Sequence, residues 1–104
     1  MHRVAFKMKL HPGQAEEYRK RHDEIWPELE EELHAAGLKE FSIYLDEDTM
    51  TLFAFHLQED EAAGSEQPGG EIQIKWWAFM EPLMECNDDN SPKTWPLKEV
   101  FYMK

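Results

Sequence analysis

Residues 41–57, FSIYLDEDTMTLFAFHL, contain two runs in which apolar side chains recur at every second position. The first run extends from Phe41 to Leu45 and the second from Met50 to Leu57, and the polar turn DEDT lies between them at 46–49. A period of two is typical of a strand with one buried face. The stretch therefore predicts a β-hairpin in the middle of the chain.

A helical pattern precedes the hairpin. Side chains on one strip recur at spacings of three and four, at Ala15, Tyr18, His22, Ile25, Trp26, Leu29, Leu33 and Ala36. Such spacing predicts a helix. Pro27 either kinks this helix or opens a second one at its first turn, where the missing N–H costs least. Gly37 supplies a stop, because glycine tolerates the left-handed conformation that ends many helices.

A loop and a second helix follow the hairpin. Residues 59–71, EDEAAGSEQPGGE, hold three glycines and one proline among acids, which predicts a flexible loop. Apolar residues at helical spacing then resume, at Ile72, Trp76, Phe79, Met80 and Leu83. This amphipathic helix should end near ECNDDNSP at 85–92, where Asn, Asp and Pro all favour turns.

Strands are predicted at both ends of the chain, from Arg3 to Leu10 and from Leu97 to Met103. The order strand, helix, strand, strand, helix, strand is that of an α+β, ferredoxin-like domain, with helices on one face of a mainly antiparallel sheet. At 104 residues the chain is expected to form one domain spanning 1–104. Apolar residues on both sheet faces would leave one face uncovered, which favours a symmetric dimer.

Charge and cysteine content narrow the classes of partner. Twenty-two acidic and eleven basic residues give a net charge of -11, which argues against nucleic acid or an anionic membrane as a partner. A single cysteine, Cys86, rules out an internal disulfide. The first residues alternate in polarity and no run approaches the length of a membrane span, so we expect a soluble cytoplasmic protein.

Tyr18 and His22 form the first candidate site. They lie four residues apart, about 40° around a helix, so their side chains share one strip that faces the sheet. One interpretation is a core pair satisfied by hydrogen bonds to the protein. The other is a small-molecule pocket in which His22 exchanges protons near neutral pH. Trp26, beside Pro27, is expected to be a packing anchor.

Trp76 and Trp77 diverge by about 100° on a helix, so one of them must face something other than the core. Trp77 either packs at an edge or lines a pocket in which an indole face meets the C–H face of a sugar. The five histidines lack the spacing of a helical metal site, so no metal is expected. The sequence also lacks GxGxxG, P-loop and GxSxG motifs.

Five segments together resemble the L-rhamnose mutarotase family. They are EEYRKRHDEIWPELEEELHAAG, SIYLDEDTMTLFAF, KWWAFMEPLM, NDDNSP and LKEVFYM, and they cover nearly the whole chain except residues 58–74. The resemblance implies a ferredoxin-like domain that dimerises through its sheets into a dimeric α/β barrel. It also implies an isomerase that interconverts the α and β anomers of L-rhamnose, a 6-deoxy sugar, without a cofactor.

The resemblance assigns site residues by position. His22 stands at the family's proton-donor position, and Tyr18, Trp76 and Trp77 stand at its sugar-binding positions. Phe41 departs from the pattern, because the family carries a tyrosine there, and the Gly- and Pro-rich segment at 59–71 departs as well. On this basis His22 is expected to be the acid toward the ring oxygen, while water, Tyr18 or a carboxylate remain open as the base.

Two other functions are compatible with such a fold. Dimers of this kind also include cofactor-free monooxygenases that oxidise aromatic substrates with oxygen. Alternatively, the protein is a non-catalytic dimer that binds a small molecule, with the Tyr, His and Trp side chains serving only as core.

Overall fold

The computed structural model describes residues 1–59 and 70–104, so most of the predicted loop at 59–71 lies outside the described residues. The elements in chain order are β1 (His2–Lys9), α1 (Ala15–Asp23), α2 (Pro27–Ala35), β2 (Leu38–Asp46), β3 (Thr51–Gln58), α3 (Glu71–Met80), the 3-10 turn η1 (Glu81–Leu83) and β4 (Trp95–Pro96). Within these described ranges, no helix is long and apolar enough to cross a membrane.

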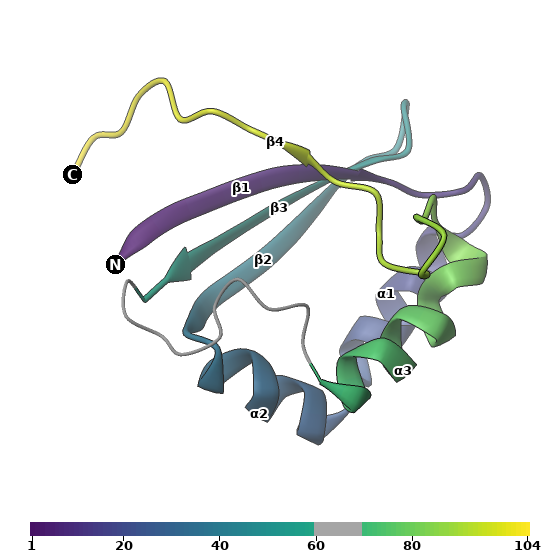
Figure 1. Ribbon diagram of the computed structural model, residues 1–104. Helices are drawn as coiled ribbons and strands as arrows, with labels where there is room; N and C mark the ends of the chain where they lie inside the picture. Colours follow the sequence, from purple (N-terminus) through teal and green to yellow (C-terminus); the bar gives the residue numbers. More distant parts are fainter. Residues whose placement is uncertain (60–69) are drawn as a thin grey trace.

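The four strands form one antiparallel sheet in the order β2-β3-β1-β4, and the helices lie on one side of it (Figure 1). This order, with β1 between β3 and β4, is that of a split βαββαβ unit. The predicted α+β, ferredoxin-like class is therefore confirmed.

The hairpin of β2 and β3 carries the core of the sheet. Ile43 pairs with Ala54 and Leu45 pairs with Leu52, as the alternation predicts. Leu52 and Ala54 are fully buried under the helices, and the buried residues continue at every second position to Gln58. One face of β3 is thus a continuous part of the helix-covered core.

Pro27 opens a second helix instead of kinking the first. Helix α1 ends at Asp23, and Pro27 occupies the first turn of α2, where its missing N–H leaves no bond unmade. Gly37 follows α2 with φ of +89°, the left-handed conformation that the stop requires. The second alternative for Pro27 is therefore the one that the structure shows.

The strand predicted from Leu97 to Met103 is wrong. Strand β4 covers only Trp95–Pro96, and one further bond joins the Leu97 N–H to the Ala5 carbonyl at 2.9 Å. Pro96 has no N–H to donate to a ladder, and the chain beyond it diverges from β1 (Figure 1). The segment is held instead by Arg3, which bonds Glu99 at 2.6 Å and lies 3.5 Å from the centre of the Tyr102 ring.

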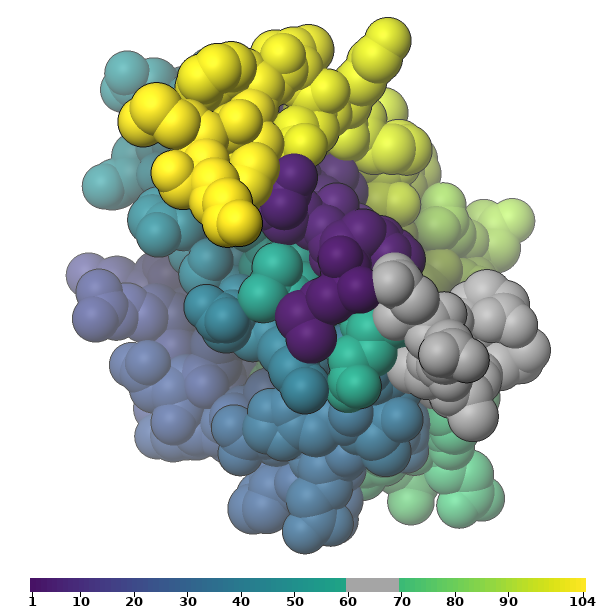
Figure 2. Space-filling model, turned by 90° about the vertical axis from the view of Figure 1, so that its left-hand side faces the viewer, coloured from purple at the N-terminus to yellow at the C-terminus, as the bar shows by residue number. Residues whose placement is uncertain are grey.

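Apolar side chains also cover the sheet face opposite the helices. Tyr44 and Phe55 stack edge to face there with ring centres 5.8 Å apart, and they are 62% and 41% exposed. The C-terminal segment adds Val100 and Phe101, which are 88% and 78% exposed. Figure 2 shows this segment, in yellow, beside the N-terminal end of β1 in purple.

Candidate active site

A cleft of about 1280 Å³ lies between the helix-covered face of the sheet and the helices. Side chains from β1, α1, α2, β2, β3 and α3 line it, together with the segment from Met84 to Thr94. Most small-molecule sites have volumes of roughly 300 to 1,000 Å³. The cleft is therefore large enough for a monosaccharide, which would fill only part of it.

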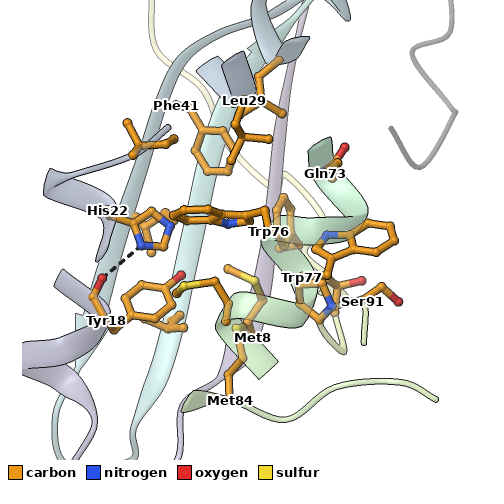
Figure 3. A pocket seen from close by; sticks show the side chains of 18 of the residues that line it. Met8, Tyr18, His22, Leu29, Phe41, Gln73, Trp76, Trp77, Met84 and Ser91 are labelled. Carbon is orange, nitrogen blue, oxygen red and sulfur yellow. Dashed lines mark hydrogen bonds between the residues drawn. The ribbon is translucent and has the colours of Figure 1, made fainter. Parts of the chain in front are cut away.

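Tyr18 and His22 meet in this cleft, as the helical spacing predicts. Their rings stack with centres 4.4 Å apart, and His22 Nδ1 lies 3.1 Å from the Tyr18 carbonyl oxygen (Figure 3). A carbonyl oxygen only accepts, so Nδ1 carries the proton and donates it. The other ring nitrogen, Nε2, is consequently the unprotonated atom whenever the ring is neutral.

Both polar tips of this pair are open to the cleft. Across residues 1–59 and 70–104, no buried side-chain nitrogen or oxygen lacks a hydrogen-bond partner. His22 Nε2 and the Tyr18 hydroxyl have no bond to the described protein, so each must be in reach of solvent within the cleft. Neither side chain is thus a core group fully satisfied by the protein.

Burial sets the protonation of both side chains. It lowers the pKa of His22 below its ordinary value of 6.5, against the smaller raising effects of the Tyr18 carbonyl and Asp23. It also raises the pKa of the Tyr18 hydroxyl far above its usual range. At neutral pH, His22 is therefore a neutral ring that can accept a proton, and Tyr18 is a protonated hydroxyl that can only hydrogen-bond.

Trp76 joins the pair, and Trp77 does not. The Trp76 ring meets His22 edge to face with centres 5.5 Å apart and meets Trp26 in the same way at 5.0 Å. Trp26 is thus a packing anchor, as predicted. Trp77 projects from the other side of α3 toward Ser91 (Figure 3). Both indoles line the cleft, but among the described residues only Trp76 makes a ring contact with His22.

Arg21 ties the helix that carries His22 to α3. Its Nε lies 2.7 Å from Glu17, its Nη1 donates to the Phe79 carbonyl, and its guanidinium lies 4.2 Å from the centre of the Phe79 ring. Phe79 in turn packs against Trp26 and Trp76, with ring centres 5.5 Å and 5.7 Å away. This arrangement fixes the spacing between His22 and Trp76.

Phe41 lies on the sheet side of the cleft, which we call the sheet floor, opposite the helix wall. It contacts a residue that was not predicted to belong to the site. Its ring packs against His56 of β3 with centres 5.4 Å apart. No ring contact joins Phe41 to His22 or Trp76 among the described residues. The signal for His56 was present, because the alternation of β3 places it on the same face as Leu52 and Ala54.

No group of three or more His, Cys, Asp or Glu side chains suited to a metal ion occurs in the described part of the chain. The chemistry that the residues themselves offer is proton transfer and hydrogen bonding beside aromatic surfaces.

Comparison with known proteins identifies the family of this chain. A sequence model of the L-rhamnose mutarotase family matches residues 3–103. The chain belongs to the L-rhamnose mutarotase family. It is 49% identical over 104 residues to an L-rhamnose mutarotase of Formosa agariphila, with all of both chains covered. It is 52% identical over 103 residues to an L-rhamnose mutarotase of Listeria monocytogenes, covering 99% of each.

The structure agrees with the sequence comparison. A crystal structure of L-rhamnose mutarotase from Formosa agariphila matches with a TM-score of 0.90, at 49% identity and over 100% of both chains. The predicted resemblance to the L-rhamnose mutarotase family is confirmed, and with it an isomerase class of reaction. The comparisons do not support a monooxygenase or a non-catalytic dimer.

Proposed function

We propose that this protein interconverts the α and β anomers of L-rhamnose, with His22 as the proton-transfer residue. Membership of the L-rhamnose mutarotase family supports the reaction and the substrate. The observation that carries the proposal is the state of His22, whose Nδ1–H is held by the Tyr18 carbonyl while Nε2 opens into the cleft.

The proton balance of the reaction suits one histidine. Ring opening moves one proton from the anomeric hydroxyl to the ring oxygen, breaks the bond between C1 and the ring oxygen, and leaves an aldehyde. Closure after rotation about the bond to C1 reverses these steps on the other face. Because both oxygens are bonded to C1, neutral Nε2 accepts the hydroxyl proton and then donates it to the ring oxygen. In this mechanism His22 is both the acid toward the ring oxygen and the base toward the anomeric hydroxyl.

Burial argues against Tyr18 as the base. Tyr18 keeps its proton near neutral pH, because burial raises the pKa of its hydroxyl. We therefore assign Tyr18 to hydrogen bonding with the sugar, and Trp76, Trp77 and Phe41 to contact with its apolar surfaces. Mutarotation already proceeds in water, so the barrier reduction required is modest, and no cofactor enters this mechanism.

Anomer exchange measured by saturation-transfer NMR tests the proposal. The purified protein should accelerate exchange of L-rhamnose well above the spontaneous rate, and L-fucose measured beside it should show how selective the site is. If no deoxyhexose exchanges faster with the protein than without it, the proposal is wrong. Oxygen uptake with a quinol would instead favour a monooxygenase.

We also propose that the chain acts as one cytoplasmic domain that forms a homodimer through the open face of its sheet. The exposed pair Tyr44 and Phe55 and the exposed C-terminal residues support this interface, since soluble monomers rarely expose large apolar patches. The net charge of -11 disfavours nucleic acid and anionic membranes as partners.

Sedimentation of the wild type and of Phe55→Glu tests the dimer. The wild type should have the mass of two chains, and the variant should dissociate, because a carboxylate would be buried at the interface without a partner. A wild-type protein with the mass of one chain at micromolar concentration would contradict the dimer.

A further inference from the structure

Besides His22 and the exposed His34, a buried histidine lines the cleft on its sheet side. His56 is 9% exposed and faces the helices from β3, between Phe6 and Phe41. The centres of these two rings lie 6.3 Å and 5.4 Å from the centre of the imidazole. His56 has no role in the proton transfer or sugar contacts proposed above.

The orientation of His56 is fixed by one hydrogen bond. Its Nδ1 lies 3.1 Å from the Leu57 carbonyl, which can only accept, so Nδ1 carries a proton. Nε2 has no hydrogen bond to the described residues, yet no buried side-chain nitrogen among them lacks a partner. Nε2 is therefore not fully buried, and His56 is one of the residues that line the cleft.

Gln58 is a buried polar residue on the same face of β3, and its hydrogen bond stabilises the fold. It is two residues along the same strand, on the same face and 8% exposed, but its amide donates to the Ala36 carbonyl at 2.8 Å. Its hydrogen bond joins β3 to the end of α2. His56 is buried to the same extent and lines the cleft, but its Nε2 has no hydrogen bond to the described residues.

We propose that His56 determines sugar specificity by accepting, at Nε2, a hydrogen bond from a hydroxyl of L-rhamnose. This inference rests on the proposed function. It would provide a polar contact beside Phe41, where the resemblance places a tyrosine in the family. His22 takes the anomeric hydroxyl in the proposed mechanism, so the hydroxyl that His56 binds is one of the others. His56 therefore contributes to binding and takes no part in the proton transfer.

The test compares His56→Leu, which removes both ring nitrogens, with His56→Gln, which restores a hydrogen-bonding group. For L-rhamnose, His56→Leu should raise KM roughly two- to tenfold and leave kcat within about twofold, as expected for one lost neutral hydrogen bond. His56→Gln should recover part of that loss. Gln58→Leu is the matched control, which should lower the melting temperature and leave KM unchanged.

Monodeoxy analogues of L-rhamnose, each lacking one hydroxyl away from C1, identify the partner of His56. One analogue should have the same KM with the wild type and with His56→Leu, because its contact is already missing, while the others retain the full difference. An equal loss for every analogue, or an unchanged KM for L-rhamnose, would overturn the inference.

Direct binding separates this inference from the proposed function. Titration of tryptophan fluorescence with L-rhamnose gives a Kd for the wild type and for His56→Leu, whether or not the protein turns over. Binding that His56→Leu weakens, without any acceleration of exchange, would refute the activity and retain His56 as a binding residue. Equal Kd values would overturn the role of His56, and so would an absence of wild-type binding.

Discussion

His22 on the helix wall of the cleft and His56 on its sheet floor are held in the same way. In both, Nδ1 lies 3.1 Å from a backbone carbonyl oxygen and Nε2 is left to the cleft. Their surroundings differ, because His22 stacks on Tyr18 and meets Trp76, whereas His56 lies between two phenylalanines. An identical local bond therefore does not fix the role of a histidine.

The neighbouring groups suggest how the two roles separate. His22 shares its wall with the Tyr18 hydroxyl, and burial lowers its pKa so that the neutral ring dominates near pH 7. The ring contacts of His56 in the described part of the chain are with Phe6 and Phe41, and it lies on β3, between β2 and β1 in the sheet. We therefore expect changes at the helix wall to alter kcat, and changes at the sheet floor to alter KM.

The largest effect is expected for His22→Asn. Asparagine keeps a polar side chain but cannot carry the proton, so kcat for anomer exchange should fall roughly 10²- to 10⁴-fold. Saturation-transfer NMR measures the rate. The matched control is His11→Asn, since His11 is exposed and lies outside the cleft, and it should leave kcat unchanged. Unchanged turnover in a folded His22→Asn protein would remove His22 from the mechanism.

The pH dependence of the wild type should give the next largest effect. Neutral His22 accepts the proton, and its pKa is lowered below 6.5 mainly by burial. kcat/KM should therefore stay level as the pH falls to 6.5, and then decline by up to about tenfold per pH unit once the ring becomes protonated. The spontaneous rate must be subtracted at each pH. A decline that begins well above pH 6.5 would contradict a neutral resting ring.

Alternation and helical spacing in the sequence predicted where many of these residues lie, because such patterns show which face of a strand or helix is buried. The stripe on α1 placed Tyr18 and His22 together, and the hairpin of β2 and β3 was predicted from apolar residues such as Leu52 and Ala54. The same alternation wrongly extended β4, since periodicity does not reveal whether a neighbouring strand remains in reach. Which edge of a buried face meets a ligand depends on packing between distant elements, and so His56 was missed.

Tyr18→Phe should have a smaller effect and concerns the helix wall alone. It removes a hydroxyl and keeps the ring that stacks on His22. Because the Tyr18 hydroxyl stays protonated, we expect the loss of one hydrogen bond, a rise in KM of roughly two- to tenfold. The acid limb of the pH profile should not move. A fall in kcat of more than about 100-fold would instead show that Tyr18 carries a proton in the reaction.

Phe41→Tyr should have the smallest effect, and it tests the sheet floor by adding a hydroxyl there. The new group lies beside the His56 ring, whose centre is 5.4 Å from that of Phe41. A neutral hydrogen bond contributes about 0.5 to 1.5 kcal/mol. We expect KM for L-rhamnose to fall about twofold, the low end of that range, if His56 already bonds the sugar.

The gain should be larger, toward tenfold, when Phe41→Tyr is combined with His56→Leu, because the hydroxyl then replaces the only polar contact on that side. A double-mutant cycle of KM values measures this coupling. Equal gains in both backgrounds would show that positions 41 and 56 act independently. A rise in KM with Phe41→Tyr alone would mean that packing of the phenylalanine on the imidazole outweighs any new hydrogen bond. The cleft would then be divided into a polar helix wall and an apolar floor.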